Sequence, residues 1–380
     1  MTTLKGITWN HTRGFLPMVA TAQRYGEAHP NVEITWCKRT LQEFADYPIQ
    51  KLAEEFDLLV IDHPFVGYAA AHPVLLPLDE YLPAEFLADQ AAQSVGKSHE
   101  SYLYNGHQWA LAIDAATPVC SYRLDLLEAK KVELPETWEE VLELARRGLV
   151  ILAALPVDCL MHFFMFCCAL GEEPFSQGEK IVSEEVGVAA LQHFRELLSL
   201  CPPECFSRNP IATYEALTSQ DDALYCPFAY SYSNYARPEY ARHPLRFGGL
   251  VELSNGRRLR STLGGAGLAI SRRCREIEVA LEYAQYVAGV ECQRGLYFTS
   301  GGQPGYRAAW LDPLVNARCG NFFLDTLPTM EEAYVRPRYD GYLDFQDRAG
   351  TVVHRFLREG GDPRAVLAEM ESIRREGART

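Results

Sequence analysis

The first part of the chain alternates between the periodicity of strands and that of helices. The expected elements occur in this order: strand 4–9, helix 14–29, strand 31–38, helix 42–55, strand 57–62 and helix 66–71. Residues 57–62 are an apolar run between polar ends, which is typical of a strand buried on both faces. This order predicts a parallel α/β sheet, in which ligand sites lie at the carboxyl ends of strands.

The remainder of the chain mixes hairpins, strands and helices. Asn105-Gly106 is a strong signal for a hairpin turn. The pattern predicts further strands at 107–113, 120–123, 149–156, 223–227 and 261–271. It predicts further helices at 124–130, 138–147, 159–170, 186–200, 276–287 and 363–375. No low-complexity linker separates these elements, which indicates lobes that interleave along the chain.

Length and charge narrow the class of protein. With 380 residues, the chain is longer than one hydrophobic core usually serves, so two lobes are expected. Its formal net charge of -14 argues against nucleic acid and anionic membrane as partners, because both select clustered Lys and Arg. No apolar run reaches the roughly 18 residues of a transmembrane helix, so no membrane insertion is expected.

The N-terminal residues and the cysteines favour a cytoplasmic location. Residues 1–6 lead directly into the first predicted strand, without the apolar stretch of a secretory signal. Eleven cysteines without framework spacing suit a reducing compartment. Cys201 and Cys205 form one close pair with no second pair to match, so no metal site is expected, and no cofactor either. The location would be periplasmic if an export signal had been removed.

Several segments, in order and with plausible spacing, resemble one known family. They are 75–82 (LLPLDEYL), 104–111 (YNGHQWAL), 122–127 with 134–141 (LPETWEEV), 262–271 (TLGGAGLAIS), and Gln293 followed by 301–304 (GGQP). In particular, the Pro-Glu-Thr-Trp-Glu start of a helix is similar to a signature of that family. Together these segments resemble the family 1 extracellular solute-binding proteins of ABC importers, and they span about 230 residues.

The resemblance implies an α/β, periplasmic-binding-protein-like type II fold. Each of its two lobes would be a mixed sheet flanked by helices, with the ligand cleft between the lobes. Lobe one would comprise 1–112 plus 260–308, and lobe two 116–258 plus 312–380. The chain would cross between lobes near 113–115, 259–260 and 309–311, where hinges are expected. If the protein is exported, the membrane subunits of an ABC transporter would be its partners; the missing signal is where this chain departs from the family.

The loop after the first predicted strand offers groups suited to a polar ligand. Trp9 can stack on a sugar ring, while His11, Thr12 and Arg13 lie where a helix N-terminus offers free backbone N–H groups. Arg13 can bind a carboxylate, sulfonate or phosphate through its fork of donors. The alternative is that Trp9 packs in the core and Arg13 is solvated.

Other candidate ligand contacts follow the same logic of strand ends and loops. Asp62 and His63 end the buried strand, although Asp62 would also serve as a helix cap. Asp114 lies at the first crossover, where a structural role in a turn is equally open. The remaining candidates are polar, aromatic or glycine residues: Asp158, His162, Tyr230, Tyr232, Gly264, Gly265, Tyr306 and Arg307.

The basic candidates determine the kind of ligand that is expected. His11, Arg13, His63, His162 and Arg307 together would make the cleft more basic than a neutral sugar needs. We therefore predict a solute-binding protein that closes on a small polar, acidic ligand, such as a sugar acid or another carboxylate.

Two other classes of function remain open. One is a cytoplasmic enzyme of the same fold that acts on a small acidic or thioester substrate. Its general acid and base groups would come from His63 with Asp62 and from His11 with Asp114. The other is a ligand sensor that docks to another protein. The chain contains no Gly-x-Ser-x-Gly elbow, Walker loop or His-Glu-x-x-His motif, which favours a binding protein.

Overall fold

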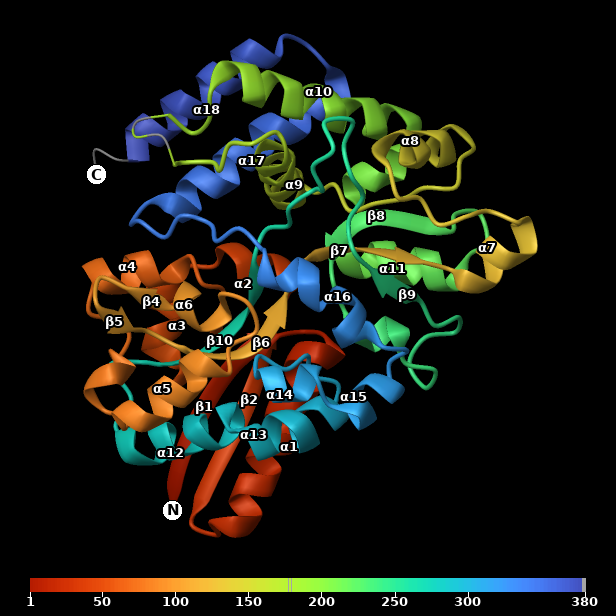
Figure 1. Cartoon of the computed structure of the whole chain (residues 1–380). Coiled ribbons are helices and arrows are strands. Elements are labelled where there is room, and N and C mark those ends of the chain that lie inside the picture. The colour runs from red at the N-terminus through yellow and green to blue at the C-terminus, as the bar shows by residue number, and fades with distance from the viewer. Residues whose placement is uncertain (177, 179, 378–380) are drawn as a thin grey trace. The chain divides into compact units, whose positions relative to one another are not determined.

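The protein is described here by a computed structural model, which covers residues 1–176, 178 and 180–377. Its chain forms two compact units (Figure 1). Unit 1 consists of Met1–Ala116, Gly264–Ala317 and Arg338–Asp340. Unit 2 consists of Thr117–Leu263, Arg318–Pro337 and the described residues from Gly341 onward. Each unit is thus assembled from separate stretches of chain, and the lobe boundaries expected from the sequence stay a prediction.

Unit 1 contains a five-stranded sheet with the order β2-β1-β3-β10-β6. Its strands are β1 (Thr2–Trp9), β2 (Val32–Arg39), β3 (Leu58–Ile61), β6 (Leu111–Ala116) and β10 (Gly264–Ile270). The strands β1, β2 and β3 are parallel, as predicted, whereas β10 runs antiparallel to both β3 and β6. The last residues of β1, β2, β3 and β6 and the first residues of β10 therefore lie at one edge of the sheet, which we call the carboxyl edge.

Helices cover the sheet of unit 1, whose central strand β3 is apolar on both faces. All four residues of β3 are buried. The helix α1 (Thr12–Ala28) packs against β2, and α12 (Ile277–Ala288) packs against β6 and β10 (Figure 1). The other helices and the small hairpin of this unit are α2 (Leu41–Asp46), α3 (Ile49–Glu55), α4 (Phe65–Ala71), α5 (Ala84–Ala92), α6 (Ser98–Ser101), β4 (Leu103–Tyr104), β5 (His107–Gln108), α13 (Val290–Cys292), α14 (Arg307–Trp310) and α15 (Pro313–Ala317).

Two predicted elements of unit 1 are divided in the structure. The helix expected over 42–55 is two helices, α2 and α3, separated by Tyr47 and Pro48. Pro48 disfavours helical geometry at the preceding residue, and Tyr47 is indeed extended (ψ 132°). The strand expected over 107–113 is β5 and β6 with an interruption at Trp109 and Ala110. The predicted Asn105-Gly106 turn is confirmed, since both residues have positive φ between β4 and β5.

Unit 2 combines a small antiparallel sheet with a group of longer helices. The strand order is β8 (Tyr225–Tyr230), β7 (Pro118–Tyr122) and β9 (Arg246–Gly248). The helices are α7 (Leu124–Lys130), α8 (Trp138–Arg146), α9 (Pro156–Ala169), α10 (Glu184–Leu200), α11 (Pro210–Ser219), α16 (Phe322–Glu331), α17 (Tyr342–Glu359) and α18 (Pro363–Gly377). Nearly every side chain of α9 is buried, because α10 and α17 pack against it.

The strand predicted at 149–156 is wrong. This apolar segment is irregular and forms a single bridge, between Val150 and Tyr225. Residues 149–154 are buried all the same, so burial rather than strand pairing explains their apolar character. Pro156 begins α9 directly afterwards, as Pro commonly does at a first helical position. The neighbouring strand expected at 223–227 is β8, which extends further, to Tyr230.

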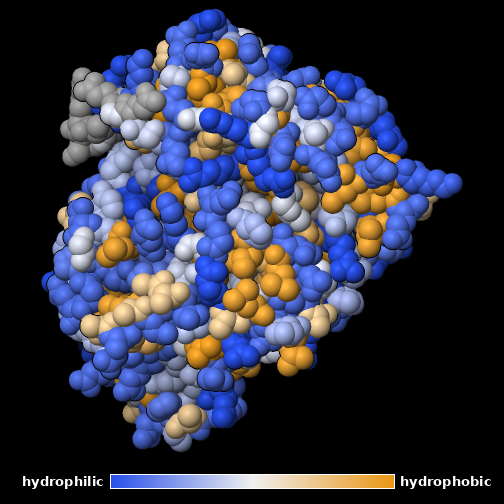
Figure 2. Space-filling model, viewed as in Figure 1, coloured by the Kyte–Doolittle hydropathy of each residue, from blue (hydrophilic) through white to orange (hydrophobic). Residues whose placement is uncertain are grey.

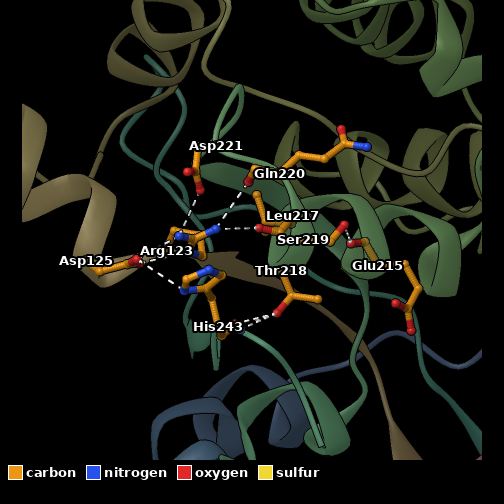
Figure 3. Close-up of polar contacts among 9 residues, drawn as sticks. All are labelled: Arg123, Asp125, Glu215, Leu217, Thr218, Ser219, Gln220, Asp221 and His243. Carbon is orange, nitrogen blue, oxygen red and sulfur yellow. Dashed lines mark hydrogen bonds and ion pairs between the residues drawn. The ribbon is translucent and has the colours of Figure 1, made fainter.

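A buried arginine, Arg123, forms several hydrogen bonds where β7 is followed by α7 (Figure 3). Arg123 has 1% of its side chain exposed, and its Nε and Nη2 atoms donate to the two carboxylate oxygens of Asp125 at 2.8 and 2.7 Å. Nη1 donates to the carbonyl oxygens of Leu217 and Gln220, both at 3.2 Å, and Nη2 also reaches Asp221 at 3.1 Å. The side chain thereby ties the end of α11 to the start of α7.

The surface is mainly hydrophilic in the view of Figure 2, with apolar residues in small separate patches. Scattered exposed apolar residues are normal for folded proteins. Within the described part of the chain, no helix is both long enough and apolar enough to cross a membrane.

Candidate functional site

An ion pair lies at the carboxyl edge of unit 1. Arg13, in the first turn of α1, donates from Nε to Oδ2 of Asp114 at 2.8 Å and from Nη2 to Oδ1. Asp114 lies in β6, and both side chains are buried. Burial raises the pKa of Asp114, and the Arg13 guanidinium opposes that shift. The fork of Arg13 that the sequence analysis assigned to a ligand carboxylate therefore already holds a carboxylate of the protein.

His11 is the N-cap of α1, which is why its side chain is fixed at this edge. Its Nδ1 atom accepts a hydrogen bond from the backbone N–H of Arg13 at 3.0 Å. Burial, together with the nearby Arg13 charge, lowers the pKa of His11 to about 3. His11 is therefore neutral at pH 7, and it adds a polar ring but no positive charge.

Close packing explains two glycines near this cluster. A Cβ atom on Gly14 would lie 2.3 Å from the ring of Trp9, so α1 can begin beside Trp9 only with glycine there. Gly265 has a φ of +111°, and its Cβ would lie 2.4 Å from the carbonyl oxygen of Asp114. Gly264 pairs with Ala116 at the same edge. Both glycines of β10 therefore stand at the strand ends that the sequence analysis singled out.

Asp62 and His63 follow β3 at the same edge and are both buried. Oδ1 of Asp62 accepts from the backbone N–H of His63 at 2.8 Å and lies 3.3 Å from its Nδ1 atom. Asp62 also has a local structural role, because its carbonyl oxygen accepts from Phe65 at the start of α4. The ring of His63 meets Tyr102 edge-on at 6.4 Å.

Arg39, the last residue of β2, lies at the same edge but was not among the candidates predicted from the sequence. Its side chain is buried, and Nη2 donates to the carbonyl oxygen of Val60 at 3.0 Å. A signal was present in the sequence, because Thr40 and Glu43 form a capping box that predicts a helix start directly after Arg39. Arg39 thus follows the same strand-end logic as Trp9 and Asp62.

The polar candidates of α9 lie in the interior of unit 2. Asp158 and His162 are one helical turn apart and are both buried, and the ring of His162 lies 4.6 Å from that of Phe228. Burial raises the pKa of Asp158 to about 7 and lowers that of His162 to about 3. At neutral pH, His162 is therefore an uncharged residue among aromatic rings.

The aromatic segment after β8 supplies hydroxyl groups in unit 2. Tyr230 is half-buried, and its hydroxyl lies 3.1 Å from that of Thr262. Tyr232 is buried and lies 6.3 Å from the ring of Tyr214. Tyr230 is thus only partly shielded from solvent, whereas Tyr232 is fully buried.

The loop that contains Tyr306 and Arg307 is tied down within unit 1. The hydroxyl of Tyr306 donates to Asp89 at 2.8 Å, and Nε of Arg307 donates to the carbonyl oxygen of Ser94 at 3.3 Å. The buried Gln303 donates from Nε2 to the carbonyl oxygen of Ala115 at 2.8 Å. The chain at 301–307 is therefore hydrogen-bonded to β6 and α5.

Among the described residues, no group of three or more His, Cys, Asp or Glu side chains is arranged to hold a metal ion. The eleven cysteines are all free thiols, and ten of them are buried or half-buried.

The fold matches that of sugar-binding proteins of ABC transporters. No family model matches the chain. Maltose-bound MalE3 of T. maritima superimposes with a TM-score of 0.83 at 18% identity, over 98% of this chain and 98% of that chain. The GacH receptor of Streptomyces glaucescens, solved unliganded and with acarbose, matches at 0.82 and 17% identity, over 100% and 99%.

A ribitol complex of a solute-binding protein from Agrobacterium radiobacter matches at a TM-score of 0.80 and 19% identity, over 98% of this chain and 97% of that chain. These likenesses establish that the chain has the α/β, two-lobed, periplasmic-binding-protein-like fold of maltose and other sugar solute-binding proteins. The fold class predicted from the sequence and the resemblance from which it was drawn are confirmed.

Proposed function

We propose that this protein is a solute-binding protein for a sugar or polyol. The observation that carries the proposal is the match over nearly the whole of both chains to solute-binding proteins solved with maltose, acarbose and ribitol. Fold alone does not determine function, so the polar groups of each unit must also suit such a ligand.

The carboxyl edge of unit 1 is suited to hydroxyl groups. We propose that its ligand contacts come from Trp9, His11, Thr12, Arg13, Asp62, His63 and Asp114, with close backbone approach at Gly264 and Gly265. Carboxylates and neutral imidazoles accept hydrogen bonds from hydroxyls, and guanidinium groups donate to them. In unit 2, Tyr230 and Tyr232 are the proposed contacts, while Tyr306 and Arg307 are secondary candidates in unit 1.

The charges in the structure favour a neutral sugar over the predicted acidic ligand. Of the five basic candidates, His11 and His162 have pKa values lowered to about 3 by burial. Arg13 is neutralised by Asp114. An acidic ligand remains the second candidate, because Arg39, which was not among the five, contributes a buried positive charge at the same edge.

An enzymatic role receives less support from the proposed residues. A histidine with a pKa of about 3 is a weak base at neutral pH, so His11 is poorly suited to accept a proton from a substrate. Asp114 is engaged by Arg13 and is not available as its acid or base partner. The membrane subunits of an ABC transporter remain the expected protein partners if the chain is exported, and its cytoplasmic location stays a prediction.

The proposal is tested with a ligand panel. Maltose, ribitol, mannitol and acarbose are compared with glucuronate and galacturonate by thermal shift and calorimetry, and each ligand is recovered and weighed by mass spectrometry. We expect at least one sugar or polyol to raise Tm and to be recovered unchanged. His63→Ala should alter affinity only. Failure of every sugar and polyol to bind, or chemical conversion of the ligand, would overturn the proposal.

A further inference from the structure

Arg39 is a buried cation whose hydrogen-bonding capacity is largely unused. The residue is 7% exposed at the end of β2. Nη2 donates to the Val60 carbonyl oxygen, but Nε and Nη1 have no hydrogen-bond partner among the described residues and are shielded from solvent. Burial lowers the pKa of Arg39 to about 10, so the guanidinium is still charged at neutral pH. Buried polar groups in folded proteins nearly always have a partner, so these two donors call for one.

A second buried donor lies beside Arg39. Trp9 is its register partner in the parallel pair β1–β2, so the two side chains project from the same face of the sheet. Both contact the ring of Phe44: the ring of Trp9 lies 5.0 Å from it, and Cζ of Arg39 lies 5.4 Å from its centre. Nε1 of Trp9 also lacks a partner among the described residues.

The carboxylates nearest in sequence are committed to their own helix. Glu43 accepts from the backbone N–H of Thr40 at 2.7 Å and from its hydroxyl at 2.9 Å. Asp46 accepts from Nε2 of Gln42 at 2.5 Å. Both carboxylates favour the charged form of Arg39 through space, but neither supplies the two-oxygen acceptor that its fork fits.

We propose that Arg39 and Trp9 form a binding site for an oxyanion, namely a carboxylate, sulfate or phosphate group. Every unused polar atom at this position is a donor, and an oxyanion is all acceptor, whereas a neutral hydroxyl would bring a proton that needs its own acceptor. The inference goes beyond the proposed function, because it needs unit 1 alone and holds whether the oxyanion is free or belongs to the solute.

The segment that packs over the proposed site has few buried residues. The short helix α2, which carries Phe44, has no buried residue along its six positions. Its Leu41 and Phe44 are only partly buried where they pack against the core of unit 1, and α2 is separated from α3 at Pro48. Segments with few buried contacts open locally at low free-energy cost, so an anion can reach Arg39 without unfolding the sheet.

The test titrates the whole protein with sulfate, phosphate and acetate against chloride at constant ionic strength, by calorimetry and Tm. We expect at least one oxyanion to bind, with an affinity at least about tenfold weaker in Arg39→Met and an intermediate loss in Arg39→Lys. Trp9→Phe keeps the ring but removes Nε1–H and should weaken binding by a few-fold. Arg273→Met, at an exposed arginine of the same unit, should leave binding unchanged.

The outcomes separate this inference from the proposed function. The inference is overturned if oxyanions have no more effect than chloride on the wild-type protein, and this result does not depend on whether Arg39→Met folds. The inference is also overturned if wild type and Arg39→Lys bind the oxyanion equally. Neither result bears on sugar binding, which the ligand panel measures independently. If the oxyanion belongs to the solute, glucuronate should compete with sulfate; if it is free, a sugar and sulfate should bind together without competing.

Discussion

Arg39 and Arg123 are both buried arginines at strand ends, one in each unit, yet their surroundings differ. Arg123 is bonded at all three guanidinium nitrogens, to Asp125, Asp221 and two carbonyl oxygens (Figure 3). Arg39 is bonded at one, to Val60. A buried arginine whose donors are all hydrogen-bonded has a structural role. One with unused donors marks a position where another molecule can supply the missing hydrogen-bond acceptor.

The titratable groups of α9 show a third way of tolerating burial. Oδ2 of Asp158 and both ring nitrogens of His162 also lack partners among the described residues. These side chains can become neutral, and burial shifts their pKa values in that direction. An arginine cannot lose its charge at physiological pH, so only a partner can relieve Arg39.

The largest effect is expected where a buried pair is broken. Arg13→Met leaves the carboxylate of Asp114 buried and unpaired, which should lower the free energy of unfolding by about 3–5 kcal/mol at pH 7. Denaturant unfolding measures this loss. The double variant Arg13→Met/Asp114→Asn should recover much of the stability; if it is no more stable than the single variant, the buried pair is not the cause.

The pH dependence of stability should separate Asp158 from His162. The folded protein keeps the Asp158 proton up to about pH 7, whereas the unfolded chain loses it near pH 4, so this residue destabilises the fold progressively from pH 4 to 7. His162 acts in the opposite direction, because the unfolded chain takes up its proton below about pH 6.5 and the folded protein only near pH 3.

The two contributions oppose each other between about pH 4 and 6.5, so single variants should reveal them. Relative to wild type, Asp158→Asn should gain about 1.4 kcal/mol of stability per pH unit from pH 4 to 7, roughly 4 kcal/mol in all. His162→Gln should show the reverse trend below pH 6.5. Stability curves that run parallel to wild type would contradict the buried, unpartnered state of both residues.

A smaller loss is expected at the satisfied arginine. Arg123→Met deprives the Leu217 and Gln220 carbonyl oxygens of a donor and should cost about 2 kcal/mol. The two carboxylates bound by Arg123 are exposed, so they return to water at little cost. Arg146→Met, at an exposed arginine of α8, is the matched control and should change stability by less than about 0.5 kcal/mol.

The smallest loss of stability is expected at Arg39. In chloride buffer, Arg39→Met should change the free energy of unfolding by no more than about 1 kcal/mol, because it removes a buried charge along with one hydrogen bond. A loss of unfolding free energy as large as that of Arg123→Met would mean that Arg39 has a structural role too. The difference between wild type and variant should widen when the oxyanion is added.

Much of the fold could be predicted because short stretches of the sequence determine its elements. The buried strand at 57–62, the Asn105-Gly106 turn and the capping box before α8 each carry their own signal. The strand expected at 149–156 failed because an apolar run fits a buried irregular segment equally well. Pro48 could have predicted the break between α2 and α3, but the helical spacing of the apolar residues around it favoured a single helix.

The candidate site was predictable only in part. Strand ends pointed to Trp9, His11, Arg13 and Asp62, since each of these ends its strand or lies within four residues after it. The pairing of Arg13 with Asp114 joins residues 101 positions apart, and no single sequence reveals that distance relation. The neutrality of His11 and His162 likewise depends on burial by residues remote in the chain.

The position of β10 in its sheet has a consequence for biosynthesis. This strand lies between β3 and β6, yet it begins only at Gly264, after the three-stranded sheet and most helices of unit 2 have been translated. During synthesis, β3 and β6 therefore stay unpaired on one side until β10 has been made. The five-stranded sheet, which contains the first strand to be synthesised, is thus completed after the three-stranded sheet. Slow translation across 117–263 would prolong the exposure of these two apolar strand edges, which is the interval in which a chaperone would be needed most.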